Sequence, residues 1–413
     1  MNDTTTTREL PKGWRWVRLG EVAGITGGIQ KTPERAPVKL HKSFLTVRNV
    51  RHGSLDLSVV ERFEVTPKEF ERCRLQAGDL LLVEGNGSKD HIGRNAVFQE
   101  DGEWIHQNHI IRVRLPAESF SPEFISHFLS SNAGRALLLE KAQTTTGLYT
   151  LSTGKVAALE VPVPPPAEQR RIAGVLREQM GAVARARAAL EAQLAAAEAL
   201  PAAHLCAVFQ SPQAQRWPRK RLEEVAELLP SKSVASDGDT EVRAITTACL
   251  TETGFRAGGI KTSRMRRDDV AASTVKPGEV LVARSNTPDL VGRVAMFTGE
   301  EAGIVASDLT IRIWPADADF GQFLTRYLSF LYLSGYWKER AGGASGSMKK
   351  ITRSQIESEP VPYPPSGEQR AIAARLATDL ATVTRLRLAL ADQLAAVERL
   401  PAALLRRAFA GEV

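Results

Sequence analysis

The chain has 413 residues, of which 43% are apolar and 24% are charged, a balance typical of a globular protein with two or three domains. Residues 1–10 are polar, and no uninterrupted apolar run approaches the roughly 18 to 20 residues of a membrane span, so we expect a cytoplasmic protein without a membrane segment. The three cysteines are far apart and predict reduced thiols, and the net charge of +7 is compatible with a nucleic-acid partner without requiring one.

The first 163 residues predict a mixed, strand-rich domain. Residues 80–83 form a short apolar run after the turn at Gly78-Asp79, and residues 110–115 alternate as a half-buried strand does. Residues 121–139 have the pattern of an amphipathic helix that begins at Ser121 and Pro122.

A proline-rich segment then introduces a long helix. The prolines at 164–166 favour a helix start after them, so we expect helix over about residues 167–200, ended or kinked by Pro201. Its apolar positions are spaced alternately by four and three residues, which predicts a coiled-coil seam. The seam residues are Leu176, Met180, Val183, Leu190 and Leu194. Arg187 occupies one seam position, and it either fixes the register or extends its charged head to water past an apolar stem.

The same features return in the same order 200 residues later. Val161-Pro-Val-Pro-Pro-Pro and Val361-Pro-Tyr-Pro-Pro each lead to Glu-Gln-Arg, and Gly78-Asp79-Leu80 corresponds to Gly278-Glu279-Val280. We expect strands over residues 280–283 and 309–314, and a helix over residues 320–337. The second seam consists of Leu376, Leu380, Val383, Leu390 and Leu394, again with one arginine, Arg387.

The duplication predicts an α+β fold with two mixed α/β domains at residues 1–163 and 213–363. Each domain is followed by a helical segment, at residues 164–212 and 364–413. We expect the two long helices to pair as an antiparallel coiled coil with pseudo-twofold symmetry, although each helix could instead pack only on its own domain.

No duplicated catalytic set is evident in the sequence. The last of the seven histidines is His204, so the second domain has none, and His106 and His109 lack a cluster of acids or cysteines that would complete a metal site. Phosphate-loop, dinucleotide and nucleophile-elbow motifs are also incomplete. We therefore predict no catalytic residue, no metal and no cofactor.

Both domains contain polar loops rich in the side chains that contact DNA bases and phosphates. Taken singly, each loop is more simply a solvated surface, but the loops recur at equivalent places in both copies. The predicted DNA-binding residues of the first domain are Lys31, Arg48, Asn49, Arg51, His52, Asn86, Ser88, Lys89, Arg94, Gln107, Asn108, His109, Thr145 and Thr146. Those of the second domain are Lys261, Arg264, Arg266, Arg267, Arg284, Ser285, Asn286, Thr287, Arg293, Ser347, Lys349 and Lys350.

The duplicated Pro-Pro-x-x-Glu-Gln-Arg motif before a long helix, with Trp-x-x-x-x-Leu-Gly-Glu-Val near the start and Gln107-Asn108-His109 before a strand, resembles the specificity subunit of type I restriction-modification systems. The resemblance covers nearly the whole chain. It implies two target-recognition domains that each bind one half of a bipartite, asymmetric site in double-stranded DNA. It also implies helices that dock methyltransferase subunits, two in our expectation, with restriction subunits joining the complex.

The resemblance further implies a non-catalytic subunit. An alternative is a scaffold whose helices form a dimerisation stalk and whose globular domains bind peptides. In the second copy, Val305 to Asp308 stand where we align His106 to His109, so the two domains would read different bases if this segment contacts DNA.

Overall fold

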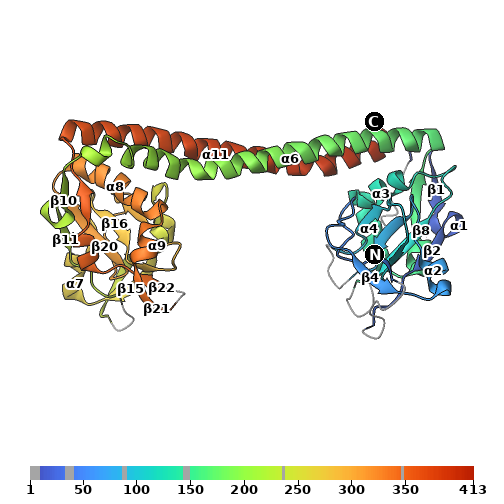
Figure 1. The fold of residues 1–413 in the computed structure, drawn as a ribbon, viewed down its shortest axis with the longest axis horizontal. Helices are drawn as coiled ribbons and strands as arrows, with labels where there is room; N and C mark the ends of the chain where they lie inside the picture. Colours follow the sequence, from blue (N-terminus) through green and yellow to red (C-terminus); the bar gives the residue numbers. More distant parts are fainter. Residues whose placement is uncertain (1–9, 33–40, 86–90, 143–148, 235–237, 346–347) are drawn as a thin grey trace, which may run out of the picture. The chain divides into compact units, whose positions relative to one another are not determined.

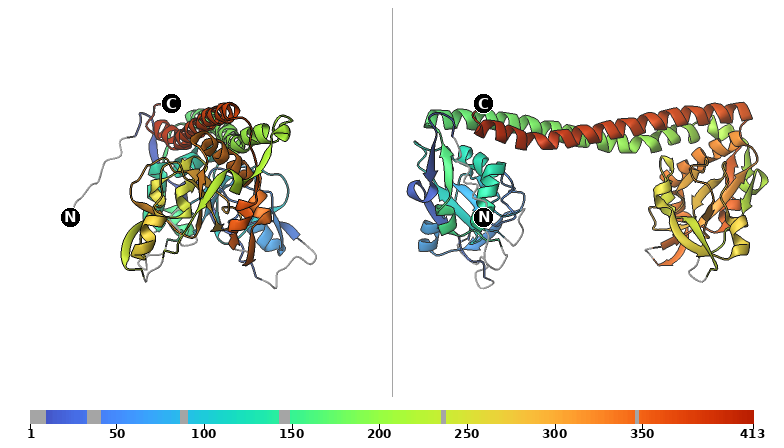
Figure 2. Two further views of the ribbon diagram at one scale, coloured as in Figure 1. Left: turned by 90° about the vertical axis from the view of Figure 1, so that its left-hand side faces the viewer. Right: turned by 180° about the vertical axis from the view of Figure 1, so that it is seen from behind.

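The computed structural model describes residues 10–32, 41–85, 91–142, 149–234, 238–345 and 348–413 (Figures 1 and 2). Contacts between residues divide the chain into two units. Unit 1 consists of Met1–Ala189 and Leu394–Val413, and unit 2 is Leu190–Gln393.

Unit 1 is built on a four-stranded sheet. Its strands are β1 (Arg15–Arg18), β2 (Gly24–Gly27), β3 (His41–Leu45), β4 (Glu61–Glu64), β5 (Leu80–Val83), β6 (Asn95–Val97), β7 (Trp104–His106), β8 (Ile110–Arg114) and β9 (Glu160–Val163). The main sheet has the order β2-β8-β5-β6, a second sheet has the order β4-β3-β7, and β1 pairs with β9. The strands predicted over residues 80–83 and 110–115 are confirmed as β5 and β8, which pair antiparallel.

The helices of unit 1 pack against its sheets. They are α1 (Leu19–Val22), α2 (Pro67–Cys73), α3 (Pro122–Ser130), α4 (Asn132–Ala142) and α5 (Thr153–Ala157). Helices α3 to α5 pack in the core of the main sheet, and α2 packs also against the second sheet. The single helix predicted over residues 121–139 is wrong in one respect, because it breaks at Ser131. That residue is extended, with ψ of 161°. Its hydroxyl accepts a hydrogen bond from the amide of Gly134, in the first turn of α4, and so caps the start of that helix.

Unit 2 repeats this architecture. Its strands are β10 (Arg219–Arg221), β11 (Ala226–Leu229), β12 (Thr240–Ile245), β13 (Leu250–Thr251), β14 (Gly254–Phe255), β15 (Lys261–Met265), β16 (Val280–Ala283), β17 (Ser285–Asn286), β18 (Val294–Met296), β19 (Ile304–Ala306), β20 (Thr310–Pro315), β21 (Gly342–Ser345), β22 (Met348–Lys350) and β23 (Pro360–Pro362). The sheets β11-β20-β16-β18 and β15-β12-β19 correspond to the two sheets of unit 1. The predicted strands over residues 280–283 and 309–314 are confirmed as β16 and β20.

The helices of unit 2 also match those of unit 1. They are α7 (Arg267–Ser273), α8 (Ala318–Leu333), α9 (Tyr336–Arg340) and α10 (Arg353–Glu357), with short 3-10 helices at Ala214–Arg216, Leu222–Glu224, Thr247–Cys249 and Ala257–Gly259. The helix predicted over residues 320–337 ends early, at Leu333. Gly335 follows in the left-handed conformation, with φ of 78°, and α9 starts after it.

The two long helices, α6 (Pro166–Phe209) and α11 (Ser366–Phe409), continue beyond Pro201 and Pro401. Of the two alternatives expected at these prolines, an end of the helix is therefore wrong, while a kink stays a prediction. The residues after each proline are held by packing. Leu205 and Val208 are buried in the core of unit 2, and Leu405 and Ala408 are buried in the core of unit 1. This burial offsets the hydrogen bond that each proline removes from the helix.

An 18-residue stretch of α6 has a mean hydropathy of 1.3, so by length and composition alone this helix could cross a membrane. The expectation from the sequence concerned only uninterrupted apolar runs, and this stretch reaches its average because alanines raise the mean hydropathy although polar residues interrupt the run. Only 28% of the stretch is buried, and the residues at the end of α6 pack into the core of unit 2.

In each unit, the start of one long helix and the end of the other share one core. In unit 1, Phe409 of α11 contacts Trp14, Phe124 and Phe128 edge to face, with ring centroids 5.3 to 6.4 Å apart. In unit 2, Phe209 of α6 contacts Trp217 and Phe323 in the same way. In both units, the tryptophan of the Trp-x-x-x-x-Leu motif therefore packs against the phenylalanine at the end of a long helix.

The seam residues of both helices are buried or partly buried. The two arginines in the seam direct their guanidinium groups to carboxylates, since Arg387 lies 3.4 Å from Glu252 in unit 2 and Arg187 lies 4.0 Å from Glu398 in unit 1. This geometry favours the interpretation in which the apolar stem lies along the seam and the charged head extends outward.

The glutamine of each Glu-Gln-Arg motif closes the proline-rich turn. Gln169 is fully buried, donates to the carbonyls of Pro164 and Ser119, and accepts from the amide of Ser121. Gln369 donates to the carbonyl of Pro364 in the same way. The motif therefore serves folding, because its amide satisfies carbonyls that the prolines leave without a helical partner.

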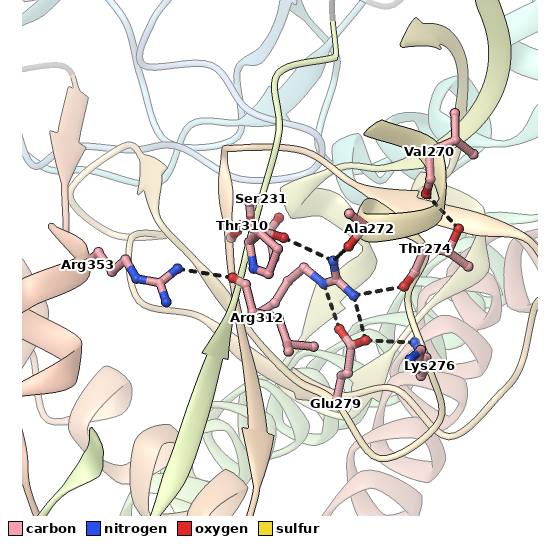
Figure 3. A network of polar contacts seen from close by, with 11 residues as sticks. Ser231, Val270, Ala272, Thr274, Lys276, Glu279, Thr310, Arg312 and Arg353 are labelled. Atoms are coloured by element: carbon pink, nitrogen blue, oxygen red, sulfur yellow. Dashed lines mark hydrogen bonds and ion pairs between the residues drawn. The ribbon is translucent and has the colours of Figure 1, made fainter. Parts of the chain in front are cut away.

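A buried ion pair supports the main sheet of unit 2 (Figure 3). Arg312 of β20 donates to both carboxylate oxygens of Glu279 at 2.7 and 2.8 Å, and the two side chains are 1% and 0% exposed. The same guanidinium donates to the carbonyls of Pro230, Ala272 and Thr274. It thus ties the end of α7 and the segment after β11 to strand β20.

The two units align at a constant offset of 200 residues between the strands β7–β8 and β19–β20. Leu81 pairs with Arg112 as Leu281 pairs with Arg312. His106 therefore corresponds to Ala306 and His109 to Leu309, so our sequence alignment of this segment is wrong by one residue. Sequence similarity between the copies is too low here to set the register, which the strand pairing defines.

Candidate nucleic-acid interface

The loop after β3 in unit 1 gathers several of the predicted residues around a cavity of about 240 Å³. Its lining includes Arg48 and Arg51, and Arg48 is exposed. Asn49 also lines the cavity but is only 4% exposed. Its amide donates to the carbonyls of Asp56 and Val59 and its oxygen accepts from Thr46, so its hydrogen-bonding groups hold the loop together.

Arg51 is oriented by an acid in the same loop. Its Nη2 lies 3.0 Å from Oδ2 of Asp56, and the Ser58 hydroxyl donates to the other carboxylate oxygen at 2.6 Å. The Ser58 hydrogen bond, followed by the one from Arg51, lowers the pKa of Asp56 to about 2. Asp56 is therefore ionised at neutral pH and holds one edge of the guanidinium, while the rest of Arg51 remains accessible.

Arg94 and Gln107 hold this loop in place through hydrogen bonds to the backbone of Val47. Arg94 donates to the carbonyl of Val47 at 3.1 Å, and Gln107 accepts from the amide of Val47 at 3.4 Å. Burial, with Arg135 and Arg94 nearby, lowers the pKa of His52, which favours its neutral form. Lys31 forms an ion pair with Glu61, which also lines the cavity.

The turn between β7 and β8 holds Gln107, Asn108 and His109. His109 is exposed, and its Nδ1 lies 3.0 Å from the carboxylate of Glu84. Asn108 is partly buried. Asn86, Ser88, Lys89, Thr145, Thr146 and Ser347 lie outside the described residues.

In unit 2, the predicted residues form separate groups. The first group is Lys261, Arg264, Arg266 and Arg267, which are all exposed at β15 and the start of α7. The guanidinium of Arg264 donates to the carbonyls of Gly238 and Asp239 at 2.6 and 3.2 Å.

The second group lies on the small sheet β17-β22-β21. The ladder pairs Ser285 with Lys350 and Asn286 with Lys349, and Thr287 follows Asn286. Arg284 precedes β17 and donates to the carbonyl of Asp308 at 3.2 Å. In Figure 1, β15, β21 and β22 lie at the end of unit 2 that is remote from α11, so both basic groups occupy this end.

Arg293 belongs to neither group. It donates to the carbonyl of Leu250 and to the Tyr332 hydroxyl, both at 3.4 Å, and lines a cavity of about 640 Å³ that also includes Arg387 and Glu252. Arg293 therefore supports the hairpin β13–β14 on the side facing the long helices, as Arg94 supports the corresponding loop of unit 1.

Leu309 was not among the predicted contacts, although it lies beside predicted residues. Leu309 is 47% exposed in the turn between β19 and β20, beside Arg284. Alignment of the copies at an offset of 200 would have identified it, because it occupies the position of His109.

The described surface offers hydrogen-bond donors and cations in two groups at one end of unit 2 and in the loop and turn of unit 1. Among the described residues, no group of three or more His, Cys, Asp or Glu side chains could hold a metal ion. The exposed arginines, lysines and histidine, with the partly buried Asn108 and Asn286, suit contacts to phosphates and base edges.

No protein-family model matches the chain. The chain is 28% identical to the Type I restriction enzyme EcoKI specificity subunit of Escherichia coli (strain K12) over 150 residues, which span 36% of this chain and 32% of that relative. It is 21% identical over 427 aligned positions to the Type I restriction enzyme StySPI specificity subunit of Salmonella potsdam, covering 98% of this chain and 90% of the relative.

Two solved structures share the fold. The HsdS subunit from Thermoanaerobacter tengcongensis matches with a TM-score of 0.65 at 22% identity and covers 99% of both chains. A chain from a structure on complex assembly and conformational transition of the type I R-M system matches with a TM-score of 0.74 at 22% identity, covering 98% of this chain and 100% of the other. The chain is thus similar in sequence to curated type I restriction enzyme specificity subunits and has the fold of solved HsdS subunits.

Proposed function

We propose that the chain is the DNA-recognition subunit of a type I restriction-modification complex. The predicted recognition domains, residues 1–163 and 213–363, would each read one half of a bipartite, asymmetric site in double-stranded DNA. The observation that carries the proposal is the duplication, in which equivalent sheets support surfaces with different exposed side chains. Equivalent supports would place each surface against DNA in the same way, and different side chains would select different bases.

The helical segments, residues 164–212 and 364–413, serve as spacer and as docking platform in this proposal. We propose that α6 and α11 pair as an antiparallel coiled coil and bind methyltransferase subunits, two in number, with restriction subunits joining the complex. Two observations support the pairing. The seam residues have low exposure, and in each unit the end of one helix shares a core with the start of the other.

The chain would have no catalytic centre, cofactor or metal of its own in this assignment, and its chemistry would come from partner subunits. It would act in the cytoplasm, where the DNA is. Turnover by the isolated chain with magnesium or a methyl donor would contradict this part of the proposal.

The deciding experiment maps methylated bases in DNA from cells that carry the partner methyltransferase, with and without this chain. We expect one bipartite motif to be methylated only when the chain is present. Absence of any chain-dependent motif, together with equal affinity of the assembled complex for all duplexes at high salt, would refute the proposal.

A variant of the basic residues in unit 2 distinguishes this function from that of a peptide-binding scaffold. Replacing Arg264, Arg266 and Arg267 by alanine should lower the affinity of a DNA-recognition subunit for DNA, because it removes exposed cations that would contact phosphates. The same changes would leave peptide binding by a scaffold intact.

A further inference from the structure

The turns that precede β8 and β20 have the same backbone hydrogen bonds in both units. In unit 1, the amide of Ile110 donates to the carbonyl of Gln107, and the amide of Glu84 donates to the carbonyl of His109. In unit 2, Thr310 donates to Ser307, and Arg284 donates to Leu309. The distances are 2.9 to 3.0 Å in all four cases. Positions 109 and 309 are therefore equivalent positions in two turns that have the same hydrogen-bonded backbone.

Further contacts fix the turn of unit 2. Ser307 Oγ accepts from the amide of Leu309 at 3.3 Å, and the amide of Asp308 donates to the carbonyl of Lys232 at 3.0 Å. Arg284 donates to the carbonyl of Asp308 from the other side. A side chain on such a turn needs little ordering when a ligand binds, which favours its use in recognition.

The side chains at the two positions have opposite chemistry. The His109 side chain is 52% exposed and presents a polar ring, with Nδ1 directed to Glu84. Leu309 is 47% exposed and lies beside Arg284. The strand β17, which follows Arg284, contains Asn286, and Asn286 pairs with Lys349 of β22. Because Leu309 is exposed on this turn among cationic and amide side chains, packing in the protein core does not explain why the residue is a leucine.

We propose that positions 109 and 309 are equivalent base-reading positions, and that Leu309 contacts the 5-methyl group of a thymine in the half-site bound by unit 2. His109 hydrogen-bonds a polar base edge in the other half-site. The proposal rests on the proposed function, since it names the bases that the two surfaces select. Apolar contact with the thymine methyl group is the established way for an aliphatic side chain to read a base in the major groove.

The first test uses the assembled complex with its mapped target. Thymines of the half-site bound by unit 2 are replaced by deoxyuridine, which lacks only the methyl group. We expect binding to weaken roughly three- to five-fold, the effect of losing one buried methyl group. Leu309→Ala should abolish this difference between thymine and uracil. Lys220→Ala, at an exposed residue of β10 away from the turn, should retain it.

The second test exchanges the two side chains. His109→Leu and Leu309→His should each change the preferred base at one position of one half-site in the methylation map. Thermal melting should be unchanged, because both side chains are exposed and the turn backbone is the same.

Two results would overturn the inference. They are an unchanged methylation motif in both exchange variants, and a thymine-to-uracil effect that persists in Leu309→Ala. Neither result affects the proposed function as long as the wild-type complex binds and modifies one bipartite motif. Failure of the proposed function would instead appear as a wild-type chain without any motif.

Discussion

At the scale of single residues, the two units use the same ion-pair chemistry with different partners. Arg112 and Arg312 occupy equivalent strand positions, but only Arg312 reaches the acid before the neighbouring strand, Glu279. In unit 1 that acid is the shorter Asp79, which instead binds Arg114 through two hydrogen bonds of 2.7 Å. Unit 2 has Trp314 at the position of Arg114, so the pairing seen in unit 1 has no arginine available there.

The buried pair of unit 2 predicts a large cost on truncation. Glu279→Ala leaves the Arg312 guanidinium buried without its counter-charge, and we expect unit 2 to lose about 3 to 5 kcal/mol of stability in urea unfolding. The exposed pair Arg353–Glu357 provides the control, because Glu357→Ala should cost less than about 1 kcal/mol. Equal costs for the two variants would contradict the assignment of a buried pair.

His106 predicts a pH dependence that is specific to unit 1. It is fully buried, and burial lowers its pKa from 6.5 to about 4. Below pH 6.5 the unfolded chain takes up a proton that the folded chain does not, so stability decreases as the pH falls from about 6.5 towards 4, and not above that range. The total effect is about 3 kcal/mol.

The measurement is urea unfolding of unit 1 at pH 7.5 and pH 5. His106→Ala, which places the residue of the second copy at this position, should reduce the loss between these two pH values. The pKa values of His52 and His127 are also lowered, so part of the dependence of stability on pH should remain in this variant. An identical slope in the variant would show that His106 is not the responsible group.

At the scale of elements, each long helix depends on tertiary contacts at its end. Local rules predicted an end or a kink at Pro201 and Pro401. Neither helix ends there, and each continues to a phenylalanine that packs in an aromatic cluster. Burial of a large aromatic side chain contributes roughly 1.5 to 3 kcal/mol, enough to offset much of the cost of one interior proline.

The seam of α11 provides a matched pair of positions for a test. Leu390 is 6% exposed, whereas Leu388 is 63% exposed on the same helix. Leu390→Glu buries a charge and should lower the melting temperature by several degrees and weaken assembly with partner subunits. Leu388→Glu should leave the melting temperature unchanged, and equal melting of both variants would contradict the seam.

At the scale of the whole molecule, the basic groups of unit 2 predict the electrostatics of DNA binding. If Arg264, Arg266 and Arg267 neutralise phosphates, their triple alanine variant should weaken binding to all sequences alike. The slope of log affinity against log salt should become shallower by about 2.7, since each phosphate contact contributes about 0.9. Lys220→Ala with Arg221→Ala, exposed on β10, should leave the slope as it is. A triple variant with unchanged slope would remove these residues from the interface.

Much of the architecture was predictable from the sequence alone. The repeat at 200 residues, the strands β5, β8, β16 and β20 and the proline-bounded starts of both long helices follow from periodicity and from proline's fixed backbone, which are local properties. The candidate surface was predictable by composition only. Asn49, Arg94 and Arg293 have the side chains of DNA contacts, but their hydrogen bonds hold loops in place.

Tertiary structure decided the remaining features, because they depend on residues far apart in the chain. The two helices extend beyond their prolines only where the other repeat supplies an aromatic cluster. The acids at equivalent positions, Asp79 and Glu279, pair with arginines at different strand positions, Arg114 and Arg312. The strand register, set by hydrogen bonds across the sheet, aligns His109 with Leu309. The amino-acid sequence by itself determined that there are two copies of one unit, and packing determined which side chains of each copy remain free to contact another molecule.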